Sequence, residues 1–387
     1  MKLTFIHTGE KIKKDIEGNF YTDGSYSMKI WNRYLERFND ITLVMRQEKS
    51  LYTKEEALKK FNLVDSEKIR FVPVPNVTES MKTYFNFSQR RQKKITIRNA
   101  IDWSDIVIVR LPGVNWVIDY SKKQNKICMV EVVGCPFDTL WNHSLKGKML
   151  AIPSAIKLKL AMRKASYSIY VTEKFLQKRY PTKGKSISVS DVNLEPIPIE
   201  KLEKKWASMR DTGELIIGTA GALNVPYKGQ QYVIEAIAAL KKTSNNRLIY
   251  VMAGTGDNTR LKNLAKSLNV EDSIIFAGSI PCEKMSEWYD SLDLYIQPST
   301  VEGLPRAVLE AMGRGLPVIG SRVGGIPEVV DEIGLFQKAD IKMLATTINK
   351  FDAMTRKQQS EINYKKSLEF TNEKLDQKRK DFYFALK

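Results

Sequence analysis

The sequence predicts an α/β protein with two doubly wound, parallel-sheet halves. Its 387 residues are too many for one ordinary domain and suit two. Short apolar runs alternate with segments of helical periodicity, which is the pattern of parallel strands covered by helices on both faces. Residues 191–200 contain two prolines and no helical pattern, so we expect the domains to be 1–195 and 196–364.

The second half shows the alternation most clearly. The expected strands are Glu214–Ala220, Arg247–Ala253, Ser273–Ala277, Leu292–Gln297 and Pro317–Ser321. The expected helices between them are Gln230–Leu240, Thr259–Leu268, Glu283–Ser291 and Pro305–Arg314. Connections between parallel strands are right-handed, which gives a doubly wound sheet.

The first half repeats this pattern less regularly. The expected strands are Lys2–Thr8, Ile41–Arg46, Arg70–Val74, Asp105–Arg110, Ile127–Val133 and Ser168–Val171. The expected helices are Tyr26–Phe38 and Gln89–Ile101. The C-terminal tail, Asn363–Lys387, is charged and has helical spacing, and we expect a helix of about residues 365–387 to pack back on the first half.

Composition excludes several classes of protein. With 6 Trp, 16 Tyr and 15 Phe, the chain has too much aromatic surface for a disordered protein. Three cysteines, at 128, 135 and 282, have neither the number nor the spacing of a disulfide framework or a zinc site. No stretch reaches the roughly 18 apolar residues of a membrane span, and the first residues are too polar for a signal peptide. We therefore expect a cytoplasmic chain or one attached to a membrane face.

The charge is unevenly distributed. Residues 1–195 have 35 basic and 20 acidic residues, a net charge of +15, whereas residues 196–387 have a net charge of only +3. Such an asymmetry indicates that the first half meets an anionic partner: nucleic acid, anionic lipid or a phosphorylated substrate. Thr139–Thr172 contains no acidic residue, and Met81–Arg98 combines basic and aromatic residues. Both stretches are candidates for an anionic membrane surface.

The densest motif lies at residues 300–330. Glu302 is followed by Gly303 and Pro305, which begin a helix, so the first N–H groups of that helix are free to bind an anion. Glu310 lies among apolar residues of the same helix, where a carboxylate is costly unless it accepts hydrogen bonds. The two hydroxyl groups of a ribose would supply them.

This stretch resembles the nucleotide-sugar site of GT-B glycosyltransferases, in particular the retaining glycosyltransferase family 4 with its E-x7-E element. The residues that match are EGLPRAVLEAM at 302–312, GLPVI at 315–319 and GGIPE at 324–328. The resemblance implies that Glu310 binds the ribose and that Glu302 is a catalytic residue beside the donor sugar. It also implies that the N–H groups of Gly303, Leu304 and Arg306 bind sugar or diphosphate, and that the fold is GT-B with two Rossmann-like domains facing a central cleft.

Further donor-binding positions follow from the same resemblance. Gly221 and Lys228 match the glycine loop and lysine that bind the diphosphate, although Ala222 stands where the family has arginine. Arg306 is our candidate to replace that missing cation. Ile280 belongs to the loop that reads the base, and Gly24 to a glycine-rich loop that faces the donor phosphate from the first half.

The family often carries a first-domain histidine near the reacting sugar. His143 follows the expected strand Ile127–Val133 and is our first choice for this catalytic role. His7, at the end of the first strand, and Asp138 are the alternatives. No D-x-D motif or metal-ligand spacing occurs, so we expect no metal and no cofactor.

Together these features predict a retaining, metal-independent glycosyltransferase that moves a hexose from a nucleotide sugar, and we expect this donor to be a UDP-hexose. The acceptor would be lipid-linked or a saccharide in surface polysaccharide assembly such as capsule, at the inner face of the membrane. Two alternatives stay open: a GT-B sugar epimerase or phosphorylase, and a basic polyanion-binding protein. No helix-turn-helix, RNP or zinc-finger pattern supports nucleic-acid binding.

Overall fold

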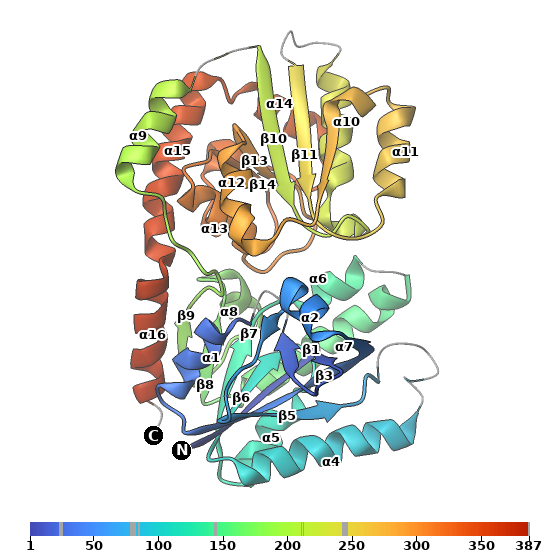
Figure 1. The fold of residues 1–387 in the computed structure, drawn as a ribbon, viewed down its shortest axis with the longest axis vertical. Coiled ribbons are helices and arrows are strands. Elements are labelled where there is room, and N and C mark those ends of the chain that lie inside the picture. The colour runs from blue at the N-terminus through green and yellow to red at the C-terminus, as the bar shows by residue number, and fades with distance from the viewer. Residues whose placement is uncertain are drawn as a thin grey trace.

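The computed structural model describes residues 1–22, 26–77, 83, 86–142, 145–209, 211, 213–241 and 247–385. Its strands form two separate sheets, and the two halves that contain them are stacked one above the other (Figure 1). The first sheet contains β1 to β9 and the second contains β10 to β15. The predicted α/β fold with two Rossmann-like sheets is confirmed.

The second sheet is entirely parallel, in the order β12-β11-β10-β13-β14-β15. Its strands are β10 Glu214–Ala220, β11 Arg247–Ala253, β12 Ile274–Gly278, β13 Leu294–Gln297, β14 Val318–Ser321 and β15 Leu335–Phe336. Its helices are α9 Ile199–Ser208, α10 Gln230–Leu240, α11 Thr259–Ser267, α12 Met285–Asp290, α13 Arg306–Gly313, α14 Ile341–Asn349 and α15 Ala353–Ser367. The strand order reverses between β10 and β13, and ligands of such sheets bind where that reversal opens a crevice.

The first sheet has a parallel part in the order β5-β3-β1-β6-β7-β8-β9, so its order reverses between β1 and β6. Its strands are β1 Lys2–Asp15, β2 Phe20–Thr22, β3 Asp40–Tyr52, β4 Asn62–Leu63, β5 Ile69–Val74, β6 Ile106–Leu111, β7 Ile127–Val132, β8 Tyr167–Tyr170 and β9 Lys185–Ser188. The helices are α1 Met28–Leu35, α2 Lys54–Lys60, α4 Phe87–Trp103, α5 Trp116–Lys123, α6 Pro136–Trp141, α7 Leu145–Met162 and α8 Phe175–Arg179.

Three short strands of the first sheet were not expected from the sequence. β2 and β4 have three and two residues and pair antiparallel at one edge, which is too short for alternation to be visible. β9 is a four-residue edge strand with two exposed residues. β1 continues seven residues beyond the expected Lys2–Thr8, and its register with β3 shifts after His7.

The C-terminal tail forms two helices rather than one. After α15 the chain turns through Leu368–Phe370 and continues as α16, Asn372–Phe384, which lies beside the first half (Figure 1). The Tyr383 ring stacks on Tyr34 of α1 with centroids 5.8 Å apart. The two segments that cross between the halves are bonded to each other, because Leu194 N donates to Asn372 Oδ1 at 2.9 Å and Asn372 N donates to Leu194 O at 3.1 Å.

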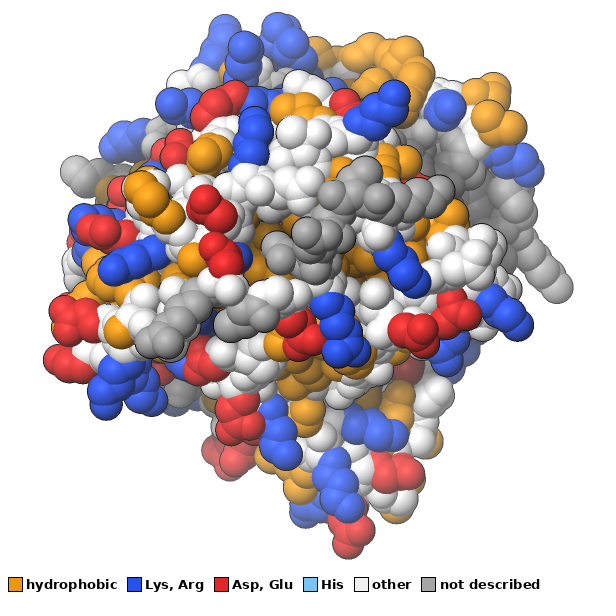
Figure 2. Space-filling model, turned by 90° about the horizontal axis from the view of Figure 1, so that it is seen from above, with side chains coloured by type: hydrophobic (Ala, Val, Ile, Leu, Met, Phe, Trp, Pro, Cys, Tyr) orange, Lys and Arg blue, Asp and Glu red, His pale blue; other side chains and the backbone are white. Residues whose placement is uncertain are grey.

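Basic and acidic side chains are intermixed over the face of the molecule seen from above, where the second half is nearest the viewer (Figure 2). This agrees with the small net charge of residues 196–387. None of the helices in the described ranges is both long enough and apolar enough to cross a membrane.

Candidate active site in the interdomain cleft

Two loops that leave the second sheet at its reversal point meet at its carboxyl edge. Gly221 follows β10, and residues 298–305 follow β13. Gly229 has a φ of 81°, and a Cβ at this position would clash with the carbonyl oxygen of Pro298. A glycine is therefore required there, and this close approach brings the preceding Lys228 to the loop that contains Glu302.

Glu302 is the centre of a buried polar cluster. Its Oε1 accepts hydrogen bonds from Lys228 Nζ at 2.7 Å, Ser299 Oγ at 2.7 Å and Gln297 Nε2 at 3.2 Å. Gln297 Oε1 in turn accepts from the Tyr295 hydroxyl at 2.8 Å. All three donors converge on one carboxylate oxygen, and no described residue donates to Oε2. The side chain is thus fixed through one oxygen, and no described residue occupies the other.

Glu310 is arranged in the same way by a different residue. Its Oε2 accepts from the hydroxyl of Tyr289, on α12, at 2.9 Å, and no described residue donates to Oε1. Tyr289 is buried, and that burial together with the adjacent Glu310 carboxylate holds the pKa of its phenol well above the usual range. Tyr289 therefore stays protonated and donates to Glu310. The loop that contains Ile280 lies close to Glu310. Burial raises the pKa of Cys282, two residues after Ile280, and the nearby Glu310 carboxylate raises it further.

The loop before α13 faces the first half. A Cβ on Gly303 would come within 2.8 Å of the carbonyl oxygen of Val133, which follows β7. The Gly303 carbonyl accepts from Gly325 N at 2.6 Å, which fixes the loop. In the described part of the chain, nothing accepts from the N–H groups of Gly303 and Leu304, so both remain available to an anion at the start of α13.

Arg306 is the first residue of α13 and points into a cavity of about 290 Å³ between the halves. The cavity is also lined by Leu304 from the second half and by His7, Tyr26 and Arg110 from the first. Arg306 makes no hydrogen bond or ion pair with any described residue. Its guanidinium is therefore not neutralised by a described partner within this cavity.

His7 belongs to a buried polar network of the first half. Its Nδ1 lies 2.8 Å from the Tyr26 hydroxyl, which also accepts from Arg110. Arg110 is paired with Asp191 and lies 3.2 Å, Nε to Oε2, from Glu131. Burial, and next the nearby Arg110 guanidinium, lower the pKa of His7 to about 3. His7 is consequently neutral near pH 7.

The structure brings together some of the predicted site residues and not others. Lys228 and Glu302 are in contact, and a Cβ added to Gly221 would lie 3.5 Å from Cδ of Lys228. Glu310 bonds to Tyr289 instead. Of the first-half candidates, His7 lines the cleft, whereas Asp138 does not line that cavity and pairs with Arg179 at 2.7 Å. His143 and Gly24 lie outside the described residues, so their assignments stay predictions.

Sequence reasoning missed Tyr289, Gln297 and Ser299. Tyr289 has the spacing of an ordinary core residue in an amphipathic helix, and Gln297 and Ser299 read as a strand end and its turn. Only their convergence on Glu310 and Glu302 gives them a role. The one signal in the sequence was the pair of polar residues, Gln297 and Ser299, directly after the apolar run of β13.

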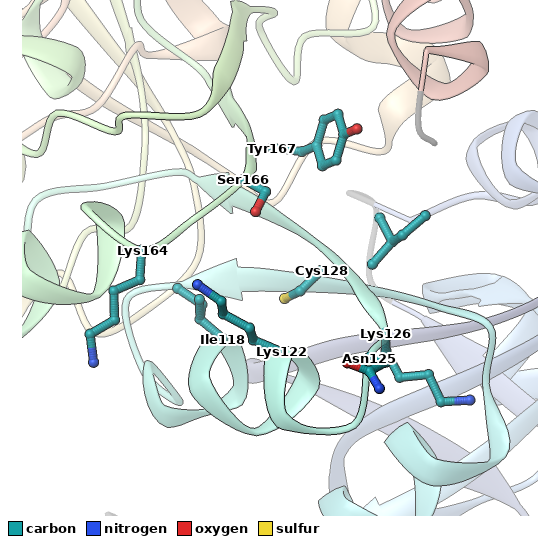
Figure 3. A pocket seen from close by; sticks show the side chains of 9 residues that line it. Ile118, Lys122, Asn125, Lys126, Cys128, Lys164, Ser166 and Tyr167 are labelled. Atoms are coloured by element: carbon teal, nitrogen blue, oxygen red, sulfur yellow. The ribbon is translucent and has the colours of Figure 1, made fainter.

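A second cavity, of about 310 Å³, lies at the opposite edge of the first sheet (Figure 3). It is lined by Lys122 and Lys126, which precede β7, and by Lys164, which precedes β8. These are the amino ends of the strands, so this cavity is separate from the cleft. Over the described residues, no group of three or more His, Cys, Asp and Glu side chains has the arrangement of a metal site.

Known proteins resemble this chain in sequence over up to nine tenths of its length. The family model described as glycosyl transferases group 1 matches residues 200–367. Protein CapJ of Staphylococcus aureus is 36% identical over 360 residues, which cover 90% of this chain and 86% of CapJ. The lipopolysaccharide core biosynthesis mannosyltransferase LpsB of Rhizobium meliloti is 30% identical over 151 residues, 37% of this chain and 42% of LpsB.

Solved structures of glycosyltransferases share the fold of this chain. The crystal structure of Anabaena HepE in complex with UDP superposes with a TM-score of 0.67 over 100% of both chains, at 15% identity. That likeness concerns the fold, which is that of GT-B glycosyltransferases. The sequence similarity to CapJ extends over both halves, so the family assignment applies to the chain as a whole and not to the second half alone. The chain belongs to the group 1 glycosyltransferase family.

Proposed function

We propose that this glycosyltransferase is a retaining, metal-independent hexosyltransferase of the family 4 type. It transfers a hexose from a nucleotide sugar to a lipid-linked or saccharide acceptor. The observation that carries the proposal is the pair of carboxylates at the cleft, Glu302 and Glu310. Each is fixed by protein donors through one oxygen and leaves the other oxygen to a ligand.

Each of these residues binds a different part of the nucleotide sugar. Glu310 accepts from the ribose hydroxyls, while Glu302 accepts from a hydroxyl of the hexose. Lys228 Nζ donates to Glu302 Oε1 and directs one of its other N–H bonds to the diphosphate. The free N–H groups of Gly303 and Leu304 and the unpaired Arg306 are the further positive groups near that diphosphate.

These N–H groups and cations promote the reaction by stabilising the diphosphate as it leaves. The bond between C1 of the hexose and the diphosphate oxygen breaks, and negative charge grows on that oxygen. Preorganised N–H groups and cations stabilise this charge more in the transition state than in the bound donor. The acceptor oxygen bonds to C1 on the face from which the diphosphate departs, and the proton of the acceptor hydroxyl passes to that diphosphate.

A uridine donor and surface polysaccharide assembly are the specific forms that we favour. HepE, which shares the fold, is described in complex with UDP, and LpsB is named for lipopolysaccharide core biosynthesis. We assign the chain to the cytoplasmic face of the membrane, where a lipid-linked acceptor would present its head group.

Isothermal titration calorimetry with UDP, GDP, ADP and CMP is the decisive first experiment. We expect UDP to bind at micromolar concentration and the others more weakly. Turnover of UDP-hexoses should then persist in EDTA, and the anomeric configuration of the product should match that of the donor. Absence of millimolar binding by all four nucleotides would contradict the donor site, and inverted product would contradict the retaining course.

A further inference from the structure

Helix α7, Leu145–Met162, has two apolar faces where a helix on a sheet needs one. Gly147, Ala151, Leu158, Ala161 and Met162 are buried and form the face toward the sheet. A second set consists of large aliphatic side chains that are between 51% and 81% exposed: Leu145, Met149, Ile152, Ile156 and Leu160. No packing against the described residues accounts for the second set.

The exposed set forms one continuous stripe. Its spacings of four, three, four and four residues place all five side chains on one side of a helix, over a length of about 22 Å. A scattered exposed leucine needs no explanation, but a stripe of five large aliphatic residues marks a surface that meets an apolar partner. Trp141, which is 40% exposed, precedes the helix and stacks on Phe137.

Lysines flank the stripe on both sides. At 100° per residue, Lys148 and Lys159 lie about 60–80° to one side of its centre, and Lys146 and Lys157 about 80–100° to the other. All four are exposed, and none of them forms an ion pair with a described residue. No acidic residue occurs from Thr139 to Thr172, so nothing in this segment offsets their charge.

We infer that α7 is the element that docks this enzyme on a membrane, lying in the plane of an anionic bilayer surface. An apolar stripe with lysines along both borders is the arrangement of an interfacial helix: the aliphatic groups enter the acyl boundary while the ammonium groups reach the head groups. A second copy of this chain is a poor occupant, because pairing two such stripes would bring the lysines of both copies together.

Docking through α7 would place the cleft near the membrane surface, and in this respect the inference rests on the proposed function. The chain leaves the cleft-facing carboxyl end of β7, passes through α6, and runs along α7 to the opposite edge of the sheet (Figure 1). The Leu145 end of the stripe is therefore the end nearer the cleft. A bilayer that contacts the stripe holds the acceptor side of the cleft near its head groups, which deepens the proposal of a lipid-linked acceptor.

Flotation with liposomes tests this inference. Wild-type protein should bind vesicles of phosphatidylcholine with 30 mol% phosphatidylglycerol, detach in high salt, and bind pure phosphatidylcholine far less. The variant K148E/K157E/K159E should lose at least about a hundredfold in its partition coefficient, since each of the three removed cations contributes about a fivefold factor and the added carboxylates are repelled as well. The variant M149Q/I152Q/I156Q should also lose binding while it keeps the lysines.

Control variants place the same types of substitution on α15 and in the turn before it. Met354, Lys357 and Ile362 are exposed on α15 and Lys350 is exposed in the preceding turn, so M354Q/I362Q and K350E/K357E should float like wild type. Equal flotation of wild type on neutral and anionic vesicles, flotation on neither, or wild-type flotation of the α7 variants would overturn the inference. So would a dimer in analytical ultracentrifugation that the α7 variants abolish.

The outcome is separable from that of the proposed function. UDP affinity, measured by calorimetry without vesicles, should be the same for wild type and both α7 variants, because α7 contributes no residue to the cleft cavity. Loss of flotation with normal UDP binding supports the docking role. Failure of UDP binding in wild type counts against the donor site and leaves the flotation result to be judged alone.

Discussion

Replacing Glu310 by glutamine tests the assignment of the ribose site with the least damage to the fold. An alanine here would leave the buried Tyr289 hydroxyl without an acceptor, at a cost of about 1–3 kcal/mol of stability. Glutamine keeps a carbonyl oxygen for Tyr289, but it removes the charge and puts an NH2 group in place of the oxygen that would accept from the ribose. We therefore expect the thermal unfolding midpoint of Glu310→Gln to change little.

The expected loss in nucleotide affinity follows from the oxygen that the protein leaves free. A hydrogen bond to a charged group contributes about 1.5–3 kcal/mol, so UDP should bind about 10- to 150-fold more weakly. The loss should concern the ribose alone. Wild type should prefer UDP to 2′,3′-dideoxy-UDP by a similar factor, and Glu310→Gln should lose that preference.

Tyr289→Phe extends the test to the residue that positions Glu310. It should reduce the same preference for the ribose hydroxyls, by less than Glu310→Gln does. Tyr250→Phe is the matched control, because Tyr250 is equally buried in the same half and bonds to Thr219 at 2.8 Å instead of to a cleft residue. Calorimetry on the folded variants decides the matter: unchanged affinity for UDP and unchanged discrimination in Glu310→Gln would refute the ribose assignment.

Three further outcomes are expected in the cleft. Glu302→Gln should keep or slightly improve UDP affinity, since Lys228 is released from its ion pair, while kcat for hexose transfer falls by at least about a hundredfold; a loss of affinity with normal kcat would contradict its role. Lys228→Met should weaken UDP more than it weakens uridine, which calorimetry with both ligands measures. His7 has a folded-state pKa of about 3, below its unfolded value, so its contribution to stability is complete above pH 6.5 and is lost as the pH falls toward 3. Between pH 7 and 4, the free energy of unfolding should therefore depend less on pH in His7→Asn than in wild type. Parallel curves from denaturant titrations of the two proteins would contradict this.

The parallel strands of the second sheet could be predicted closely because their burial on both faces makes them continuous β-branched runs. β10 and β11 begin and end at the expected residues. The edge of the first sheet could not be predicted, because two- and three-residue antiparallel strands have no readable period. The tail was expected as one helix, and the turn at Leu368–Phe370 contains neither glycine nor proline to announce it.

The site shows the same division between local and tertiary information. Glu302, Glu310 and Lys228 belong to a motif that is dense in the sequence. Tyr289 and Gln297 bond to those carboxylates from other elements, and no local pattern relates a helix residue on α12 to one on α13. Likewise, His7 reaches the cleft only because the order of the first sheet reverses beside β1.

The two segments that cross between the halves have a mechanical consequence. Two bodies joined by one strand can bend and also twist freely about it. Here the joint is double, and mutual hydrogen bonds between Leu194 and Asn372 make the two crossings a single narrow band. Two bonded crossings resist twisting more than a single crossing does, so we expect any movement between the halves to be a rotation about an axis through this band.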